Sequence, residues 1–310
     1  MSGMQQRAVV FAYHEIGVRG LSVLLALGVD IRLVVTHVDD PAEAIWFSSV
    51  AELAALNDIP VITPRDPNAA EVVEQVRASR PGVLFSFYYR HLLGAELLAI
   101  PSIGAYNLHG SLLPKYRGRV PVNWAVLQGE TETGASLHRM ELKPDAGALL
   151  DQQAVAILPN DTAQMVFWKV TCAAEQLLLR CVPLLLQGRA RETALDLSAG
   201  SYFGGRRPED GRIDWHRPAR TIHNLIRAVA PPYPGAFFII QGIRLQVLGS
   251  YYRGRPAHGH AVRLYWQDEH CYADCVDGRQ LELTAIAVAG EPLHEQGFRA
   301  RFGAAELDLA

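Results

Sequence analysis

The chain is poor in cysteine. Its 310 residues include four, which are Cys172, Cys181, Cys271 and Cys275. This density is far below that of a disulfide framework in a small secreted domain. The first residues lack the apolar stretch of a signal peptide, and no segment reaches the ~20 uninterrupted apolar residues of a membrane span. We therefore expect a protein of the reducing cytoplasm that does not insert into a membrane.

The chain also has no excess of positive charge. Residues 206–310 hold 13 Lys and Arg against 12 Asp and Glu, residues 1–205 hold 16 against 20, and the net charge is −3. A protein that binds a nucleic-acid backbone usually presents a basic surface. We therefore expect no nucleic-acid partner.

The sequence contains neither the pattern of a dinucleotide-binding site nor that of a zinc site. The first predicted strand runs into residues 14–20, which lack the glycine spacing that binds a dinucleotide. The histidines and cysteines between residues 258 and 275 fall in short strands and a polar loop, with a looser spacing than a zinc site has. We expect neither NAD nor a metal.

What the chain does contain is apolar residues, 49% of the total, enough for a sizeable core and for two domains. In the first half, strand-like runs at 8–13, 31–36, 60–63 and 82–88 alternate with helix-like runs at 18–27, 49–57, 69–79 and 92–98. This alternation predicts an α/β fold with β-α-β units on a parallel sheet. The most apolar of these runs are typical of strands that are covered on both faces.

Further elements complete the predicted first domain. Residues 103–109 form a strand that ends in polar residues, and residues 132–140 and 149–157 form paired strands around a turn. A long helix follows from about residue 162 to 186, with a cap before it and Gly188 as its stop. We place this Rossmann-like domain at residues 1–205.

The pattern changes in residues 206–310. A short helix at 219–228 and a breaker run at 231–235 precede five short alternating segments, at 236–240, 243–249, 261–266, 272–276 and 280–288. The last two segments flank Asp277-Gly278, a strong hairpin signal. We expect a small β-barrel of the oligonucleotide/oligosaccharide-binding (OB) type, with a sandwich as the alternative.

The densest group of chemically useful residues lies at 106–118. Asn107 and His109 are two positions apart at the end of a predicted strand, so both point to one face. The carboxyl end of a parallel strand is where open α/β sheets bind ligands. Asparagine can donate to an oxyanion, and histidine can transfer a proton near neutral pH. Asp145, in the turn 143–147, is the best candidate for the acid that orients this histidine.

Each of these residues also has a plainer explanation. A histidine after a strand is more often structural than catalytic. Asn107 can cap the strand end, and Asp145 can serve only to shape its turn. None of the three is persuasive by itself.

Together, however, these residues resemble the 10-formyltetrahydrofolate-dependent formyltransferases. The resemblance rests on the run 107–114, on Arg117-Gly118 and on Asp145-Ala146-Gly147, and it implies that Asn107, His109 and Asp145 are the catalytic residues. Within the family, the chain is most similar to the formyltransferase part of the bifunctional enzyme that acts on UDP-4-amino-4-deoxy-L-arabinose in polymyxin resistance. The similar stretches are 11–14, 85–91, 129–134, 137–140, 214–216 and 227–230.

That bifunctional enzyme continues into a decarboxylase domain with a dinucleotide fingerprint, whereas this chain ends at Ala310. We therefore expect a stand-alone formyltransferase. Decarboxylation and NAD dependence are not carried over, and homo-oligomerisation stays open.

The resemblance also implies a site for the co-substrate 10-formyltetrahydrofolate. It comprises two segments and one arginine, with residues His91, Leu92, Leu93, Arg119, Glu141, Leu142, Lys143, Pro144 and Asp145. Without the resemblance, His91 would be a residue at a helix start and Arg119 a surface cation.

The expected reaction transfers a formyl group to the amine of a nucleotide-linked sugar, first of all UDP-4-amino-4-deoxy-L-arabinose in lipid A modification. Four arginines can meet its pyrophosphate, because guanidinium suits paired oxygens. They are Arg117, Arg119, Arg206 and Arg207. Alternatives with the same chemistry are a dTDP-linked amino sugar, initiator methionyl-tRNA and water, and an alternative of another class is a catalytically silent folate-binding subunit. The identity of the sugar and of its nucleotide stays open.

Overall fold

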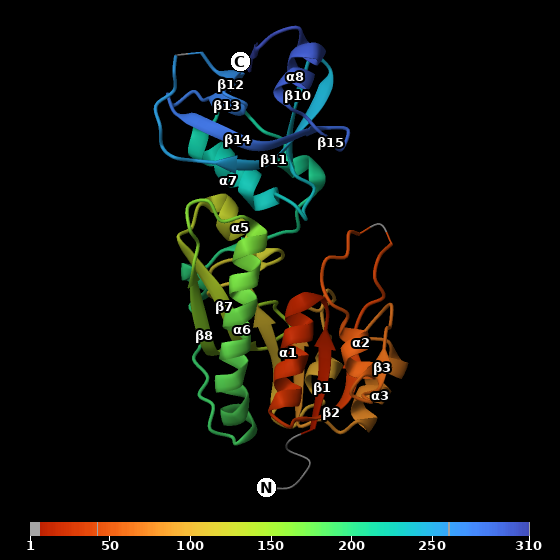
Figure 1. Cartoon of the computed structure of the whole chain (residues 1–310). Helices are drawn as coiled ribbons and strands as arrows, with labels where there is room; N and C mark the ends of the chain where they lie inside the picture. Colours follow the sequence, from red (N-terminus) through yellow and green to blue (C-terminus); the bar gives the residue numbers. More distant parts are fainter. Residues whose placement is uncertain (1–6, 42, 260, 310) are drawn as a thin grey trace. The chain divides into compact units, whose positions relative to one another are not determined.

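The computed structural model describes residues 7–41, 43–259 and 261–309, and the chain forms two compact units (Figure 1). The first unit comprises Met1–Pro121, Thr133–Val155 and Trp168–Gly204. The second comprises Val122–Glu132, Ala156–Phe167 and Gly205–Ala310. The chain therefore enters the second unit for the last time at Gly205, after contributing two earlier segments to it.

The first unit is built on a seven-stranded sheet with the order β3-β2-β1-β4-β5-β7-β8. Its strands are β1 (Arg7–Ala12), β2 (Asp30–Val35), β3 (Val61–Ile62), β4 (Val83–Phe87), β5 (Gly104–His109), β7 (Glu132–Arg139) and β8 (Leu149–Ala156). The strands from β3 to β5 are parallel, and β7 is antiparallel to β5. The predicted α/β class with a mostly parallel sheet is confirmed.

Burial explains why the central strands read as continuous apolar runs. Every residue from Ala8 to Ala12 and from Val83 to Phe87 is buried. A strand that is covered on both faces gains apolar contact from each successive side chain, so the period of two disappears.

The helices are α1 (His14–Ala26), α2 (Val50–Ala55), α3 (Ala70–Ala78), α4 (Ala95–Leu98), α5 (Pro121–Gln128), α6 (Ala163–Leu186), α7 (Ala219–Val229) and α8 (Glu295–Phe302). Two single turns of 3-10 helix, at Leu197–Ala199 and Pro208–Gly211, lie between them. The predicted cap of α6 is confirmed, because the Thr162 side chain accepts the backbone N–H of Met165 at 3.3 Å. Its predicted stop is confirmed as well, since Gly188 has a φ of +68°.

Two helix starts differ from prediction. Helix α1 begins at His14 instead of residue 18, because the Gly17 N–H donates to the Tyr13 oxygen and closes an earlier turn that packs against Ala12. Helix α4 begins at Ala95 instead of residue 92. There the Asn68 side chain donates to the backbone oxygen of Leu92 and accepts the N–H of Gly94, so these groups are unavailable to a helix.

The second unit holds an antiparallel sheet with the order β10-β11-β14-β13-β12-β16, and β15 pairs with β14 off this path. The strands are β10 (Ala236–Ile240), β11 (Ile243–Tyr251), β12 (Arg263–Gln267), β13 (His270–Asp274), β14 (Gln280–Val288), β15 (Glu291–Pro292) and β16 (Glu306–Asp308). The five predicted strands are all present, and the sheet is an antiparallel half-barrel. Sequence reasoning missed α8, because its polar sequence buries just Phe298 and Phe302.

No helix within the described ranges is long and apolar enough to cross a membrane. The four cysteines are free, and three of them are buried, namely Cys181, Cys271 and Cys275.

Candidate active site

The candidate site begins at the end of β5, between β4 and β7. Asn107 and His109 lie on the same face of this strand, as their spacing predicts. Across the antiparallel pair with β7, Asn107 is opposite His138 and His109 is opposite Ser136. The site therefore draws on β7 as well as on β5.

The imidazole of His109 lies between two oxygen acceptors. Its Nδ1 is 3.5 Å from Oδ1 of Asp145, and its Nε2 is 2.8 Å from the backbone oxygen of Tyr116. A neutral ring has one N–H and donates to one of these oxygens, whereas a protonated ring donates to both. Since His109 is 6% exposed, water does not compete for these contacts. The ring is therefore held in place by an oxygen on each side.

Asp145 holds the site together from the turn after β7. Its Oδ2 accepts the backbone N–H of Gly118 at 2.8 Å, and its Oδ1 is 3.5 Å from Nδ2 of Asn107 and 3.5 Å from Nε2 of His138. Burial by itself raises the pKa of this carboxyl group, but His109, His138 and the Gly118 N–H together lower the pKa well below its usual range. Asp145 is therefore a carboxylate at neutral pH.

His138 is a site residue that sequence reasoning did not select. Its Nδ1 donates to the backbone oxygen of Arg139 at 2.8 Å, so in a neutral ring Nε2 accepts and lies 3.2 Å from Nδ2 of Asn107, whereas in a protonated ring Nε2 donates to Asp145. With 2% of its surface exposed, the ring is fixed in this position. The sequence signal was the stretch 137–140, but only the register of β5 against β7 shows that this histidine faces Asn107.

A short parallel pair of strands positions the segment that follows His109. Strand β6 (Arg117–Gly118) pairs with β9 (Tyr202–Phe203), and the backbone N–H of Tyr116 donates to the Ser201 side chain at 2.8 Å. Gly118 has a φ of +97°, and a Cβ at this position would lie 2.2 Å from the Phe203 backbone oxygen. Only glycine fits here, and its N–H is the one that Asp145 accepts.

The first predicted donor segment, residues 91–93, is held by its contacts with the core and with Asn68. Leu93 is buried in the core beside Leu97, whereas His91 is exposed and Leu92 is 68% exposed. The Asn68 side chain holds the backbone on both sides of Leu93: it donates to the oxygen of Leu92 and accepts the N–H of Gly94. This segment thus presents backbone and one apolar side chain to solvent.

The second predicted donor segment has the same character. Glu141, Leu142 and Lys143 are exposed, Leu142 by 69%, and Pro144 and Asp145 are partly buried. The preceding Met140 packs on the core cluster that also contains Leu93. Both segments therefore start from one cluster, and each presents an exposed leucine that a flat aromatic ligand can cover.

The four predicted arginines occupy different environments. Arg119 is exposed, and Arg117 is 9% exposed with an Nε that has no hydrogen-bond partner among the described residues. Arg206 and Arg207 belong to the second unit. There the Arg206 guanidinium lies over the Trp124 ring at 5.2 Å, and burial lowers its pKa. Arg207 is exposed.

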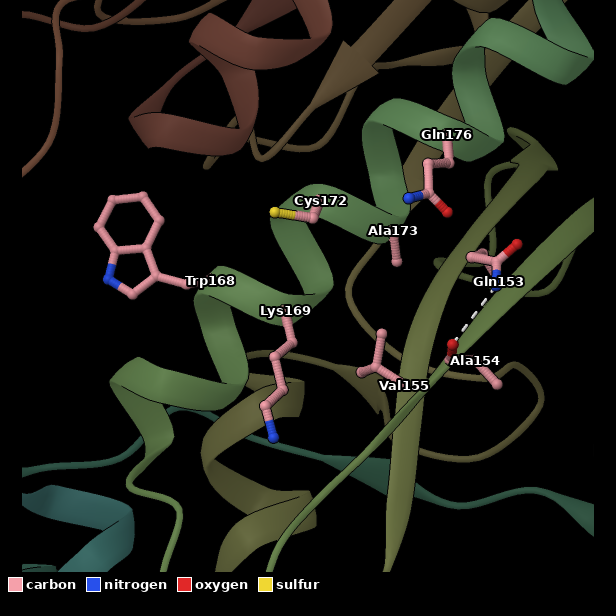
Figure 2. A pocket seen from close by; sticks show the side chains of 8 residues that line it. All are labelled: Gln153, Ala154, Val155, Trp168, Lys169, Cys172, Ala173 and Gln176. Atoms are coloured by element: carbon pink, nitrogen blue, oxygen red, sulfur yellow. Dashed lines mark hydrogen bonds between the residues drawn. The ribbon is translucent and has the colours of Figure 1, made fainter.

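A cavity of about 400 Å³ lies elsewhere in the first unit, between α6 and β8. Figure 2 shows its lining, which contains none of the predicted site residues: Gln153, Ala154, Val155, Trp168, Lys169, Cys172, Ala173 and Gln176. In the parts of the chain that the structure describes, no three His, Cys, Asp or Glu side chains are placed to hold a metal ion. The cavity and the candidate active site are thus separate features.

Comparison with known proteins identifies the family. A formyl transferase model matches residues 23–182, and a model of the formyl transferase C-terminal domain matches residues 206–291. The chain belongs to the formyl transferase family, as the sequence resemblance predicted.

Solved structures share the fold across both units. WlaRD, a sugar 3N-formyl transferase crystallised with dTDP and 5-N-formyl-THF, matches 92% of this chain and 98% of its own with a TM-score of 0.72 and 20% identity. An N-formyltransferase from Helicobacter canadensis, in complex with folinic acid and dTDP-3-aminofucose, matches 90% of this chain and 98% of its own with a TM-score of 0.71 and 20% identity. HypX from Aquifex aeolicus, in complex with tetrahydrofolic acid, matches 96% of this chain and 47% of its own with a TM-score of 0.64 and 15% identity.

Proposed function

We propose that this chain transfers a formyl group from 10-formyltetrahydrofolate to the amine of a nucleotide-linked sugar. The observation that carries the proposal is the convergence of Asn107, His109 and the Asp145 carboxylate at the end of β5. Family membership supports formyl transfer, and the folate compounds bound to WlaRD and to the Helicobacter canadensis enzyme support the donor.

In the proposed mechanism, His109 exchanges the contact of Nε2 with the Tyr116 oxygen for the acceptor and takes a proton from the sugar ammonium, directly or through water. The free amine then attacks the formyl carbon. Asp145 keeps the imidazole oriented and stabilises its charged form. Asn107 donates to the oxyanion of the tetrahedral intermediate. The attacking nitrogen then gives up a second proton, and His109 donates one proton to N10 as tetrahydrofolate leaves. Of the two protons that the ammonium loses, one ends on N10 and the other passes to solvent, so the proton count balances. His138 holds the amide of Asn107 and does not touch the reacting atoms.

The donor lies, in this proposal, against the backbone of His91, Leu92 and Leu93 and against residues 141–145, with Arg119 nearby. The exposed Leu92 and Leu142 side chains support this placement, since folate presents a flat ring that gains from apolar contact. Backbone N–H and C=O groups suit the amide-like edge of a pterin.

We propose UDP-4-amino-4-deoxy-L-arabinose as the acceptor, in lipid A modification linked to polymyxin resistance, on the strength of the sequence resemblance. A dTDP-linked amino sugar is the second candidate, favoured by the ligands of two structural neighbours. Arg117 supports a diphosphate in either case, because a buried guanidinium whose Nε has no partner among the described residues can bind paired oxygens. Initiator methionyl-tRNA is disfavoured by the near balance of charges in residues 206–310.

The division at residue 205 into a catalytic domain and an OB-like domain, and a place in the reducing cytoplasm, are part of this proposal. Free cysteines support the second point.

The decisive experiment incubates the purified chain with 10-formyltetrahydrofolate and one acceptor at a time. The acceptors are UDP-4-amino-4-deoxy-L-arabinose, a dTDP-linked amino sugar, initiator methionyl-tRNA and buffer alone. We expect tetrahydrofolate release and an N-formyl product with the UDP sugar. Release in buffer alone indicates a hydrolase, and binding of folate without turnover on any acceptor indicates a silent subunit.

A further inference from the structure

A loop after β2 contacts the segment from which the donor site begins. His37 lies in this loop, and its Nε2 is 3.1 Å from the backbone N of Arg90. Its ring stacks on Tyr89 with centroids 4.1 Å apart and meets the edge of His91 at 4.9 Å. One side chain thus touches three successive residues of the segment that leads into Leu92 and Leu93.

The same loop is fastened to the segment by charge. Arg90 Nη1 and Nη2 donate to the two carboxylate oxygens of Glu43 at 2.8 and 2.7 Å. The guanidinium also lies over the Tyr13 ring at 4.6 Å, and the Tyr13 hydroxyl donates to Asp39 at 2.7 Å. Such a two-point ion pair restricts both partners more than a single contact does.

His37 is suited to accept a hydrogen bond. Burial, with the nearby His91 and Arg90, lowers the pKa of His37 to about 4. The ring is therefore neutral at physiological pH, and the short distance to an N–H donor identifies Nε2 as its unprotonated nitrogen.

The segment needs such support because its backbone is not part of a regular element. Strand β4 ends at Phe87, Tyr88 has a φ of +57°, and α4 does not begin until Ala95. A residue other than glycine at positive φ costs about 1 kcal/mol, so external contacts must stabilise this path. Asn68 supplies them at Leu92 and Gly94, and His37 supplies them at Arg90.

We infer that His37 is a positioning residue of the donor site: by accepting the Arg90 N–H it holds residues 88–91 so that the backbone of His91 to Leu93 is presented to 10-formyltetrahydrofolate. The inference rests on the proposed function for the identity of the donor. In this inference the loop after β2 raises the affinity for the donor, although it does not contact the reacting atoms.

Two substitutions separate the hydrogen bond from the ring packing. His37→Phe keeps an aromatic ring against Tyr89 and removes the acceptor, whereas His37→Gln keeps an acceptor and removes the ring. The readouts are equilibrium binding of 5-formyltetrahydrofolate, a stable analogue of the donor, and steady-state KM and kcat for both substrates. His270→Phe, at an exposed histidine of the second unit, is the matched control.

We expect His37→Phe to weaken folate binding and raise the donor KM about tenfold, the size of one lost hydrogen bond, with kcat and the acceptor KM unchanged. His37→Gln should recover most of this loss, and His270→Phe should bind like the wild type. Unchanged folate binding by a folded His37→Phe protein overturns the inference while leaving the proposed function intact. An equal loss in both His37 variants also overturns it. Failure of the wild type to bind the folate overturns the proposed function, and this inference with it.

Discussion

Asn107 and His138 face each other across the antiparallel pair of β5 and β7, with Nδ2 of the amide 3.2 Å from Nε2 of the ring. Because Nδ1 of a neutral His138 donates to a backbone oxygen, its Nε2 accepts, and this contact orients the Asn107 amide. An oxyanion donor acts through its orientation, so the catalytic role proposed for Asn107 depends on this buried histidine.

Replacing His138 tests this dependence. We expect His138→Phe to lower kcat about tenfold, since the amide loses its partner, and to leave the donor KM unchanged. His138→Gln, which can accept from the same amide, should retain more activity. The measurement is steady-state kinetics on proteins with matched circular dichroism, and a His138→Phe enzyme with wild-type kcat would contradict the role.

Alanine substitutions of the three proposed catalytic residues should lower kcat by different amounts. We expect His109→Ala and Asp145→Ala to lose about 10²- to 10⁴-fold in kcat, the usual contribution of general base catalysis. Asn107→Ala should lose about 10²-fold, roughly 3 kcal/mol, while its donor affinity is preserved. Turnover and folate binding are measured on purified protein. Wild-type turnover in a folded His109→Ala enzyme would end the proposed mechanism.

Gly118 links stability to activity. A Cβ in Gly118→Ala meets the Phe203 backbone oxygen at 2.2 Å, so the backbone must move and the N–H leaves Asp145. We expect a loss of roughly 2 kcal/mol or more in unfolding free energy, together with a lower kcat. The control is Gly188→Ala, also at positive φ but with nothing within 4 Å of the added Cβ. Gly188→Ala should lower the free energy of unfolding by about 1 kcal/mol and leave kcat unchanged. Urea unfolding measures the first quantity and steady-state kinetics the second.

Replacing Arg117 should raise the KM for the acceptor sugar and leave the KM for the folate donor unchanged. We expect Arg117→Met to raise the acceptor KM at least about tenfold, because a charge-assisted pair with phosphate oxygens is lost, and Arg117→Lys to recover part of it. The donor KM serves as the internal control. An increase in the donor KM instead would place Arg117 at the glutamate carboxylates of the folate.

Stability should fall in mild acid. Burial lowers the pKa of His14 to about 3 and of His223 to about 4. The unfolded chain therefore binds protons below its histidine pKa of about 6.5 while the folded chain does not, and each group removes up to about 1.4 kcal/mol per pH unit in that range. Asp145 acts differently: its lowered pKa adds stability that is present above an unfolded pKa of about 3.9 and is lost only at lower pH.

Urea unfolding at pH 7.5 and pH 5.5 measures this loss. We expect His223→Gln to show a smaller difference between the two pH values than the wild type, and His216→Gln, at an exposed position, to show the same difference. Equal stability of the wild type at both pH values would contradict the prediction.

The positions of most strands and helices could be predicted because they depend on local pattern. The buried runs of β1 and β4, the alternation of the late strands and the Asp277-Gly278 turn are all readable within a few residues. The start of α4 was mispredicted because the backbone just before it is held by Asn68, a residue 24 positions from Leu92. No local pattern reports such a contact.

For the site, sequence alone determined that Asn107 and His109 share one face of a strand end, since a period of two is a property of any extended chain. The tertiary structure decided that Asp145 meets His109, that His138 faces Asn107, and that Ser201 and Phe203 hold the segment around Gly118. These relationships depend on the register between distant strands and on how a turn folds back. Both depend on how the whole unit packs. That packing is determined by the summed free energy of many weak contacts between residues far apart in the sequence.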